Sequence, residues 1–467
     1  MTKRIVSLSF LVLLCISTAV YADNVAEKSS VAGKKIFKGA ALTGSKQGQA
    51  IGFADVDGDG VEDRIVGAPY AASSSGTGAV LVYKGTGEGG FYSSPSMLLD
   101  GDDNYGFSFA NMGDVNGDGK EEYAVGAIHG NGPAVSLCGN VTVYRGGKNK
   151  GNKKVIAKLS GEGPMDKFGY FISSGDLNGD GKKDLIAGAP FNTNDPSLYQ
   201  GGAVYVYLAP DFADKVALHA SSQNKGLGWS AATGDINGDN IADLCINATG
   251  KALCYYGSAD FNPSTDSPDV TIKSSASGFG KALAVIGDLN GDGFGEILIG
   301  APNAVIDGNR DTGSLYIVKG GTGERTLNLN SPPSDLIVRI DGAGLFDRFG
   351  FSIARLGDVD GNQKDDFAVG SPTADSETFP LAGKVYFFSG EDISETATLS
   401  NSAVLEGPVP NSGFGASLAA SKDSHLLIGA SRCDTDTGEV SFVDPSTGLI
   451  VSDTKGAGTT GGGDSCH

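Results

Sequence analysis

Short, almost uninterrupted runs of apolar residues recur along the chain, and glycine or proline bounds most of them. Runs of this kind predict strands, and their lack of alternation predicts strands that are buried on both faces. Several runs end in Gly-Ala-Pro or a close variant, where proline stops the hydrogen-bond ladder. Second strands of the repeated units are predicted at residues 64–66, 123–125, 185–187 and 297–299, and third strands at 79–83, 141–144, 203–207, 314–318 and 384–388.

An aromatic residue followed by glycine opens most of these units. The pairs are Tyr105-Gly106, Phe168-Gly169, Phe279-Gly280, Phe349-Gly350 and Phe414-Gly415, with Leu227-Gly228 in the fourth unit. Units of four antiparallel strands, repeated around a ring, are the blades of a β-propeller. The sequence therefore predicts an all-β fold, a seven-bladed β-propeller with four-stranded antiparallel blades. The predicted blades span residues 48–101, 102–161, 162–221, 222–276, 277–342, 343–407 and 408–455.

The two ends of the chain lie outside these units. Residues 23–47 form an N-terminal segment, and residues 456–467 form a glycine-rich tail. Because an open sheet edge is a liability, we expect a strand near residues 36–38 to pair into the seventh blade and close the ring.

A nine-residue acidic loop follows the first strand of six units, at steps of 59, 62, 59, 53 and 70 residues. Acids or amides occupy positions 1, 3, 5 and 9, and glycines let the backbone fold tightly enough for these side chains to converge. Such a cage of oxygen atoms suits Ca²⁺. We therefore expect about six Ca²⁺ sites. Their ligands would be Asp55, Asp57, Asp59, Asp63; Asp114, Asn116, Asp118, Glu122; Asp176, Asn178, Asp180, Asp184; Asp235, Asn237, Asp239, Asp243; Asp288, Asn290, Asp292, Glu296; and Asp358, Asp360, Asn362, Asp366.

The loops differ in composition. The first carries four carboxylates, whereas the sixth has Asn362 at position 5 and Gln363 in place of glycine, so we expect the sixth to be among the weakest sites. An EF-hand needs an acid at position 12, where the first loop has Val66. A turn without metal is the alternative, although converging acids without a cation would repel each other. In the seventh unit the loop has shrunk to residues 421–424, which cannot enclose a cation.

Residues 1–22 have the features of a secretory signal peptide. Lys3 and Arg4 precede an apolar run, and Val20-Tyr21-Ala22 offers a cleavage site. We expect the mature chain to be secreted or extracellular, or periplasmic or on the outer surface if the source is bacterial. Without Lys3 and Arg4 it has 33 basic and 55 acidic residues, a net charge of −22. This charge argues against nucleic acid and anionic membranes as partners, and we expect no membrane insertion.

The use of cysteine fits an oxidising compartment. Cys245 and Cys254 flank a short turn, which predicts a disulfide across a hairpin, with two buried thiols as the alternative. Cys433 with Cys466 would tie down the tail, and one cysteine is left over. Asn140 and Asn247 begin N-x-Thr sequons and are candidate glycosylation sites, or chance matches in a bacterium.

No catalytic motif is visible in the sequence. The chain has four histidines, at positions 129, 219, 425 and 467, and none pairs with another in a motif. There is no G-x-S-x-G, H-E-x-x-H or Walker sequence. We therefore expect a binding protein and not an enzyme, with an active site assembled from several blades as the alternative.

The repeated combination of aromatic-Gly, D-x-[DN]-G-D-G-x-x-[DE] and Gly-Ala-Pro resembles the FG-GAP repeats of the integrin α-subunit head. The resemblance covers about residues 48–445. It implies Ca²⁺ in the loop between the first two strands of a blade, adhesion through the opposite face and a secreted or cell-surface setting. It also raises an integrin-β-like subunit as a partner. The chain departs from the family pattern because its acidic loops run through blades one to six.

The loops opposite the metal loops vary in length and composition, as a recognition surface on a fixed scaffold does. They span residues 70–77, 128–137, 191–201, 303–312 and 373–381. Candidate ligand-binding residues are Tyr70, Phe191, Tyr199, Arg310 and Asp311, with ordinary loop residues as the alternative. The leading hypothesis is adhesion or recognition of an extracellular protein ligand. The alternative is a carbohydrate-binding, lectin-type propeller with a glycan as its partner.

Overall fold

The computed structural model describes residues 45–72, 77–86, 91–92, 95–101, 103–147, 155–193, 200–331, 335–432, 439–444 and 449–455. All of them lie in one compact unit, Lys38–His467. The predicted signal peptide, the strand expected near residues 36–38, Tyr199, Cys433, Cys466 and the tail lie outside the described residues.

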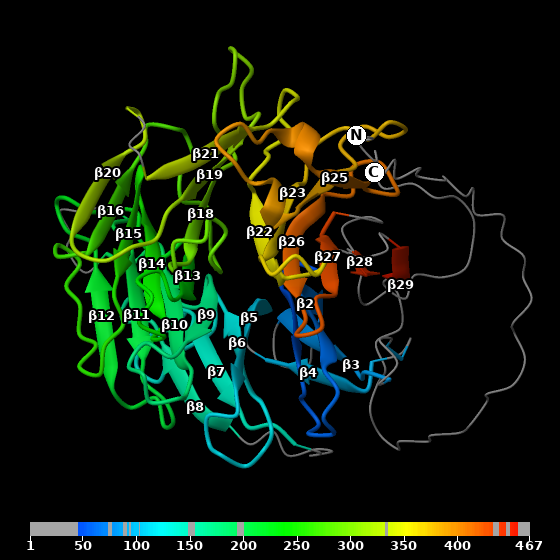
Figure 1. Cartoon of the computed structure of the whole chain (residues 1–467). Helices are drawn as coiled ribbons and strands as arrows, with labels where there is room; N and C mark the ends of the chain where they lie inside the picture. Colours follow the sequence, from blue (N-terminus) through cyan, green and yellow to red (C-terminus); the bar gives the residue numbers. More distant parts are fainter. Residues whose placement is uncertain are drawn as a thin grey trace, which may run out of the picture. The chain divides into compact units, whose positions relative to one another are not determined.

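The described chain is an all-β propeller built from groups of four antiparallel strands (Figure 1). The first groups are β1 (Ile51–Ala54), β2 (Asp63–Ala72), β3 (Thr77–Tyr83) and β4 (Met97–Asp100); β5 (Tyr105–Gly113), β6 (Glu122–Ala127), β7 (Asn140–Tyr144) and β8 (Val155–Ser160); β9 (Ile172–Gly175), β10 (Asp184–Ala189), β11 (Ala203–Tyr207) and β12 (Lys215–His219); and β13 (Ala231–Gly234), β14 (Asp243–Ala248), β15 (Lys251–Tyr255) and β16 (Val270–Lys273).

The later groups continue the same order. They are β17 (Ala282–Ile286), β18 (Glu296–Ala301), β19 (Ser314–Val318) and β21 (Leu336–Asp341); β22 (Ser352–Gly357), β23 (Asp366–Ser371), β24 (Lys384–Phe388) and β25 (Ala403–Glu406); and β26 (Phe414–Ala420), β27 (Leu426–Ala430), β28 (Glu439–Asp444) and β29 (Leu449–Lys455). Two short 3-10 helices, Gly390–Asp392 and Leu399–Asn401, precede β25. The all-β propeller fold predicted from the repeats is therefore confirmed.

Two pairings depart from this simple order. One parallel pair, Gly78 with Tyr105, joins the first two groups into an eight-stranded sheet. The strand β20 (Arg325–Asn328), from the connection between β19 and β21, pairs in parallel with β16 and extends the edge of the neighbouring sheet. The sequence did not predict β20. The outer strand of the last group is β29, which pairs with β28.

The hydrophobic core lies between neighbouring sheets. Every residue of β6, β10, β14, β18 and β23 is buried, as the continuous apolar runs predicted. One cluster joins residues of β1 to β3 with Leu427 and Val440 from the C-terminal strands. Figure 1 shows the blue N-terminal strands beside the orange C-terminal ones, and β1 lies against β26 and β27.

A contact between two glycines recurs at the boundary between neighbouring sheets. A Cβ added to Gly67 would come closer than 3.0 Å to the carbonyl oxygen of Gly106, and the same holds for Gly300 and the carbonyl of Gly350. The first glycine belongs to Gly-Ala-Pro and the second to the aromatic-glycine pair of the next unit. The Gly-Ala-Pro motif of one unit and the aromatic-glycine pair of the next unit therefore meet in one backbone contact.

The same contact joins the last group to the first. Gly429 faces the carbonyl of Gly48, and the Ser417 hydroxyl donates to that carbonyl at 2.5 Å. The Lys422 backbone N–H donates to Glu62 at 3.0 Å, and its ammonium contacts Glu121. The shrunken loop of the seventh unit therefore supplies a lysine at the junction between the two ends of the ring.

We predict that Gly300→Ala lowers the free energy of unfolding by about 3 kcal/mol, because the new methyl group would overlap the Gly350 carbonyl and force the sheets apart. Gly323→Ala is the control: its Cβ would meet no atom within 4 Å, so it costs only the strain of its positive φ of 77°, about 1 kcal/mol. Thermal melts of both variants test this. Equal decreases in the free energy of unfolding of the two variants would show that the contact between Gly300 and Gly350 is not tight.

Candidate functional site

The first residue of each acidic loop folds the loop around its own carboxylate. In the first loop, Asp55 accepts hydrogen bonds from the backbone N–H groups of Gly58 at 2.8 Å, Asp59 at 3.0 Å and Gly60 at 2.8 Å. Gly58 and Gly60 have positive φ angles of 73° and 87°, which glycine adopts without strain. The same pattern recurs around Asp114, Asp235, Asp288 and Asp358.

The ninth residue of each loop is a buried acid, and in five of the loops it also accepts from a backbone N–H just beyond the third strand. Asp184 begins β10 and accepts from Leu177 N–H at 3.0 Å and from Ala209 N–H, just beyond β11, at 2.9 Å. Asp243 makes the corresponding bonds to Ile236 at 2.7 Å and Gly257 at 2.8 Å. These acids are between 0 and 5% exposed. The members are Asp63, Glu122, Asp184, Asp243, Glu296 and Asp366.

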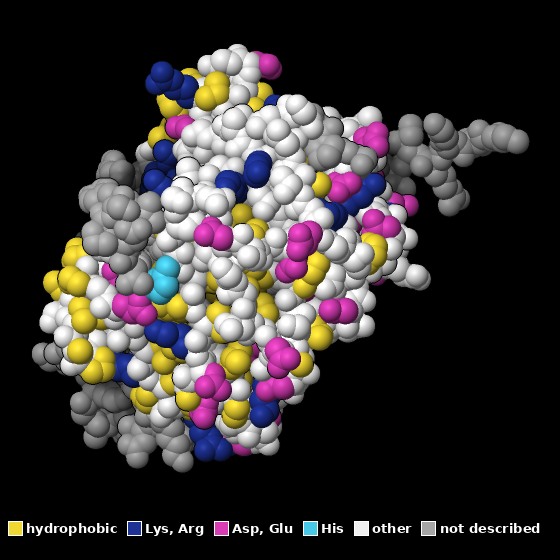
Figure 2. All heavy atoms as spheres, turned by 90° about the vertical axis from the view of Figure 1, so that its left-hand side faces the viewer, with side chains coloured by type: hydrophobic (Ala, Val, Ile, Leu, Met, Phe, Trp, Pro, Cys, Tyr) yellow, Lys and Arg dark blue, Asp and Glu magenta, His cyan; other side chains and the backbone are white. Residues whose placement is uncertain are grey.

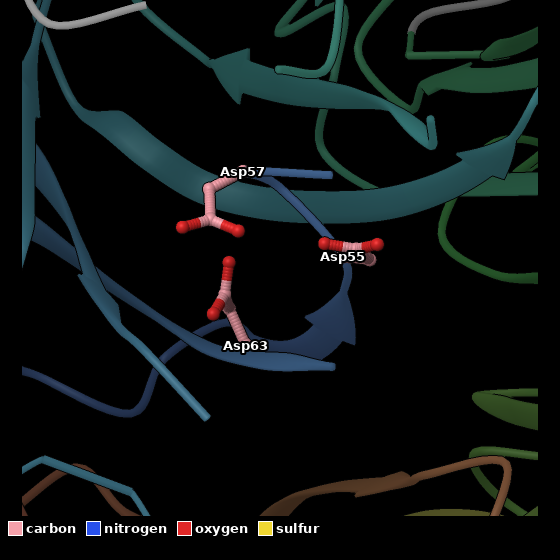
Figure 3. Close-up of side chains that lie close together, drawn as sticks. All are labelled: Asp55, Asp57 and Asp63. Carbon is pink, nitrogen blue, oxygen red and sulfur yellow. The ribbon is translucent and has the colours of Figure 1, made fainter. Parts of the chain in front are cut away.

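Three of the loops bring three carboxylates together among the described residues. In the first loop, oxygens of Asp55, Asp57 and Asp63 lie within 4.8 Å of one another, and Figure 3 shows the carboxylates of Asp57 and Asp63 pointing toward each other. The Oδ1 atom of Asp57 is buried and has no hydrogen-bond partner. The other trios are Asp288, Asp292 and Glu296, and Asp358, Asp360 and Asp366. Converging carboxylates with an unpartnered buried oxygen fit a divalent cation such as Ca²⁺.

The remaining loops place an asparagine at position 3. In the fourth loop the Asn237 amide donates to Asp239 at 3.1 Å, and in the third loop Asn178 accepts from the Asp180 N–H at 3.0 Å. In the second loop Arg145 draws Asp118 into an ion pair at 2.7 Å. These contacts hold the predicted side chains in the loop, but they bring fewer carboxylates to one point than the first, fifth and sixth loops do.

Burial makes the ninth-position acids costly to ionise. It raises the pKa of Asp63 and of Asp184 to about 6, of Asp243 to about 7 and of Glu296 to about 8. The other acids of each loop raise the pKa further, and the two backbone hydrogen bonds oppose the rise only in part. A cation among these acids would favour their charged forms.

Aromatic side chains gather at the opposite ends of the first strands. Phe107 lies near the start of β5, whereas the second acidic loop begins where β5 ends. The ring centroid of Phe107 is 5.1 Å from that of Tyr170, the Tyr170 centroid is 5.0 Å from that of Trp229, and the Trp229 centroid is 5.4 Å from that of Phe191. We call these four residues the aromatic row. A cavity of about 360 Å³ opens beside Phe107, Tyr170, Trp229 and Phe351.

The predicted recognition residues fall in two places. Phe191 joins the aromatic row, with the Lys167 ammonium 4.4 Å from its ring centre, and Tyr70 is 43% exposed with Lys46 5.1 Å from its ring centre. Arg310 and Asp311 lie apart, on the connection between β18 and β19. Their backbone carbonyls accept from Phe346 and Arg348.

Sequence reasoning missed Phe107, Tyr170, Trp229 and Phe351. Each of them directly follows the glycine of an aromatic-glycine or Leu-Gly pair. The sequence signal was therefore the repeated position directly after the glycine. The four large aromatic side chains at this position line one cavity.

The predicted disulfide is present between Cys245 and Cys254, on paired positions of β14 and β15. Cys138 is a buried free thiol. Asn140 and Asn247 are 1% and 6% exposed, and their amide groups donate to backbone carbonyls of Asn131 and Gly226. This burial argues against a glycan at either sequon in the folded chain.

The described residues contain no helix of the length and hydrophobicity that a bilayer span requires. On the face shown in Figure 2, acidic and basic side chains are interspersed, with small hydrophobic areas between them. That face carries no continuous basic patch of the kind that binds nucleic acid.

The FG-GAP repeat family matches the chain at residues 47–83, 168–207 and 279–318. Integrin alpha-PS2 of Drosophila melanogaster is 27% identical over 325 residues, which is 68% of this chain and 18% of that protein. Integrin alpha-7 of Homo sapiens is 36% identical over 214 residues, 46% of this chain and 13% of that protein. Integrin alpha-5 of Xenopus laevis is 28% identical over 306 residues, 64% of this chain and 23% of that protein. The chain thus spans less than a quarter of the length of these relatives.

We predict that, in EDTA at pH 8, Asp184→Asn lowers the free energy of unfolding by about 2 kcal/mol, because an amide offers one acceptor where the backbone presents two donors. Asp180→Asn is the matched control, since Asp180 is exposed and, within the described part of the chain, its side chain accepts from the Lys182 N–H through one oxygen. Its melt in EDTA should be nearly unchanged. Similar losses in both variants would mean that the ninth acid has no special structural role.

A second prediction concerns pH. In EDTA the folded chain should bind protons at Asp243 and Glu296 with pKa values of about 7 and 8, against ordinary values of 3.8 and 4.5. Because the folded state binds these protons more tightly than the unfolded state, stability is highest below the ordinary values and falls as pH rises toward 8. The melting temperature in EDTA should therefore be lower at pH 8 than at pH 5, and millimolar Ca²⁺ should remove most of that difference. A melting temperature in EDTA that rises over this range would contradict the assignment.

Proposed function

The chain is an FG-GAP repeat protein similar to the integrin alpha chains, and from this premise we propose that it is a secreted, calcium-binding propeller that recognises an extracellular protein ligand. It acts by binding and not by catalysis. The acidic loops stabilise the scaffold at one end of the first strands, and the aromatic row at the other end contacts the ligand.

The proposed ring has seven blades with the boundaries expected from the sequence. Two observations support this count. The four-stranded groups follow one another along the chain, and each takes one repeat of the motif. The glycine contact also runs from the last group back to the first, through Gly429 and Gly48. A closed ring buries the outward faces of the first and last sheets against each other at that junction.

Each of the six acidic loops is proposed to hold one Ca²⁺ through positions 1, 3, 5 and 9. The ion would supply two positive charges to carboxylates that otherwise repel each other. The chain supplies the cage: the first residue folds the loop, the third and fifth residues face inward, and the ninth fixes the loop to the third strand.

The aromatic row with its cavity is the observation that carries the recognition proposal. Trp229 and Phe351 are 36% and 38% exposed, and large aromatic side chains at a hollow are typical of binding hot spots in protein interfaces. Tyr70 and Phe191 extend the surface and carry Lys46 and Lys167 beside their rings. A protein ligand with apolar or acidic side chains fits this surface.

A lectin is the second candidate. The exposed Trp229 and Phe351 rings beside polar groups of Gln49 and Lys281 at the same cavity would also suit stacking against a sugar. The residue after the glycine changes from unit to unit, however, as Phe107, Tyr170, Trp229, Lys281 and Phe351. A propeller that binds the same sugar between each pair of blades would be expected to repeat this position.

We predict that Trp229→Ala lowers the affinity for the protein ligand by about 30-fold, as the loss of a hot-spot residue does. Val404→Ala, on the outer strand β25, is the control of similar exposure and should bind normally. The mature chain, immobilised in millimolar Ca²⁺, would be tested against extracellular protein fractions and a glycan array. Binding only to glycans would favour the lectin, and equal binding by both variants would remove the aromatic row from the proposal.

A further inference from the structure

We infer that Lys84 acts as a built-in cation of the first acidic loop, so that this loop binds Ca²⁺ more weakly than the loops that lack such a residue. The inference rests on the proposed calcium binding. It assigns different calcium affinities to loops whose sequences are similar, and it assigns the lowest calcium affinity to the loop with the most carboxylates.

The geometry places the lysine on two of the expected ligands. Lys84 directly follows β3, and its Nζ lies 2.5 Å from Oδ2 of Asp57 and 2.5 Å from Oδ2 of Asp59. These acids occupy positions 3 and 5 of the loop. All three side chains are between 22 and 31% exposed, so the ion pairs are partly shielded from water. A Ca²⁺ ion that enters the loop must displace the Lys84 ammonium or bind without the two carboxylate oxygens that the ammonium contacts.

The position of Lys84 recurs in every repeat because the strand register recurs. Tyr83 pairs with Arg64, just as Tyr207 pairs with Leu185 and Phe388 with Phe367. The residue after each third strand therefore stands beside the acidic loop. In the six repeats it is Lys84, Arg145, Leu208, Tyr256, Lys319 and Ser389.

Only some of these residues contact the acids at positions 3 and 5. Arg145 pairs with Asp118 alone, at 2.7 Å, and the neutral Ser389 hydroxyl donates to Asp360 at 2.8 Å. Leu208 brings no charge to the third loop. The Tyr256 hydroxyl is directed away, to the carbonyls of residues 321 and 323. Ser389 also accepts from the Asn362 amide at 3.0 Å, but it is neutral, so among these contacts Lys84 is the residue that places a positive charge on two carboxylates.

Charge explains why the lysine is in the first repeat. That loop has carboxylates at positions 1, 3, 5 and 9, whereas each of the other five has three carboxylates and one asparagine at these positions. Lys84 offsets the additional charge, so the loop can stay folded without a metal ion. Calcium affinity follows the charge and the number of ligands available, and the lysine reduces both.

The consequence concerns the junction of the ring. The first loop lies in the group that meets the last one, where Lys422 contacts Glu62 and Glu121 and the acidic loop has shrunk. Two lysines thus serve at this junction in place of calcium. The chain ends would remain joined at calcium concentrations that empty the third, fourth and sixth loops.

The test uses hydrogen–deuterium exchange of the whole mature chain at a series of Ca²⁺ concentrations, because exchange reports each loop separately. In the wild type, residues 55–63 should become protected at a Ca²⁺ concentration at least about tenfold higher than residues 176–184. Lys84→Leu should lower the midpoint of the first loop by about tenfold, and the reciprocal Leu208→Lys should raise that of the third loop. Loops not altered in each variant are internal controls.

The outcomes separate the two claims. If every loop responds to Ca²⁺ but Lys84→Leu leaves the first midpoint unchanged, the lysine is not a competing cation. If no loop of the wild type responds, the proposed calcium binding itself is wrong. Should Lys84→Leu fail to fold, Lys84→Gln removes the charge and keeps a polar side chain, and the same shift is expected. The inference would also be overturned if, in the wild type, the first and third loops became protected at the same Ca²⁺ concentration.

Discussion

The four-stranded groups that carry an acidic loop each depend on one buried acid at the ninth position of that loop. Asp184 and Asp243 each accept two backbone N–H groups, one from the loop and one from just beyond the third strand. Fixing these strands through one side chain places a carboxyl group in a buried position, with other acids beside it. The loop therefore gains hydrogen bonds at the cost of concentrated negative charge, which a divalent cation would relieve.

The scaffold separates this charge from the proposed recognition surface. In most of the repeated units the aromatic-glycine pair lies near one end of the first strand and the acidic loop follows the other end. The glycine contact between neighbouring blades holds the strands close, as at Gly300 and Gly350. The residue after the second glycine, such as Trp229, lines the cavity. One repeat motif thus sets both the packing of the ring and the position of its aromatic residues.

The sequence predicted the features that repeat and missed those that depend on contacts between repeats. The acidic loops, the strands and the Cys245–Cys254 pairing are local in the chain, so their spacing was sufficient. Lys84 lies more than 20 residues from Asp57, and only the register of β3 against β2 brings the two together. The parallel strand β20 joins a neighbouring sheet, and no local pattern encodes that pairing. Trp229 could have been predicted from the sequence, because a large aromatic residue recurs directly after the glycine of the repeated pair.

The central claim is that calcium in the acidic loops stabilises the propeller. The most direct measurement is a calorimetric titration of the mature chain with Ca²⁺, together with melts in EDTA and in millimolar Ca²⁺. The account predicts about six bound ions, the first loop filling last, and a large loss of melting temperature in EDTA. Little binding and equal melting temperatures would contradict it, because the loops would then be turns that fold without a metal ion.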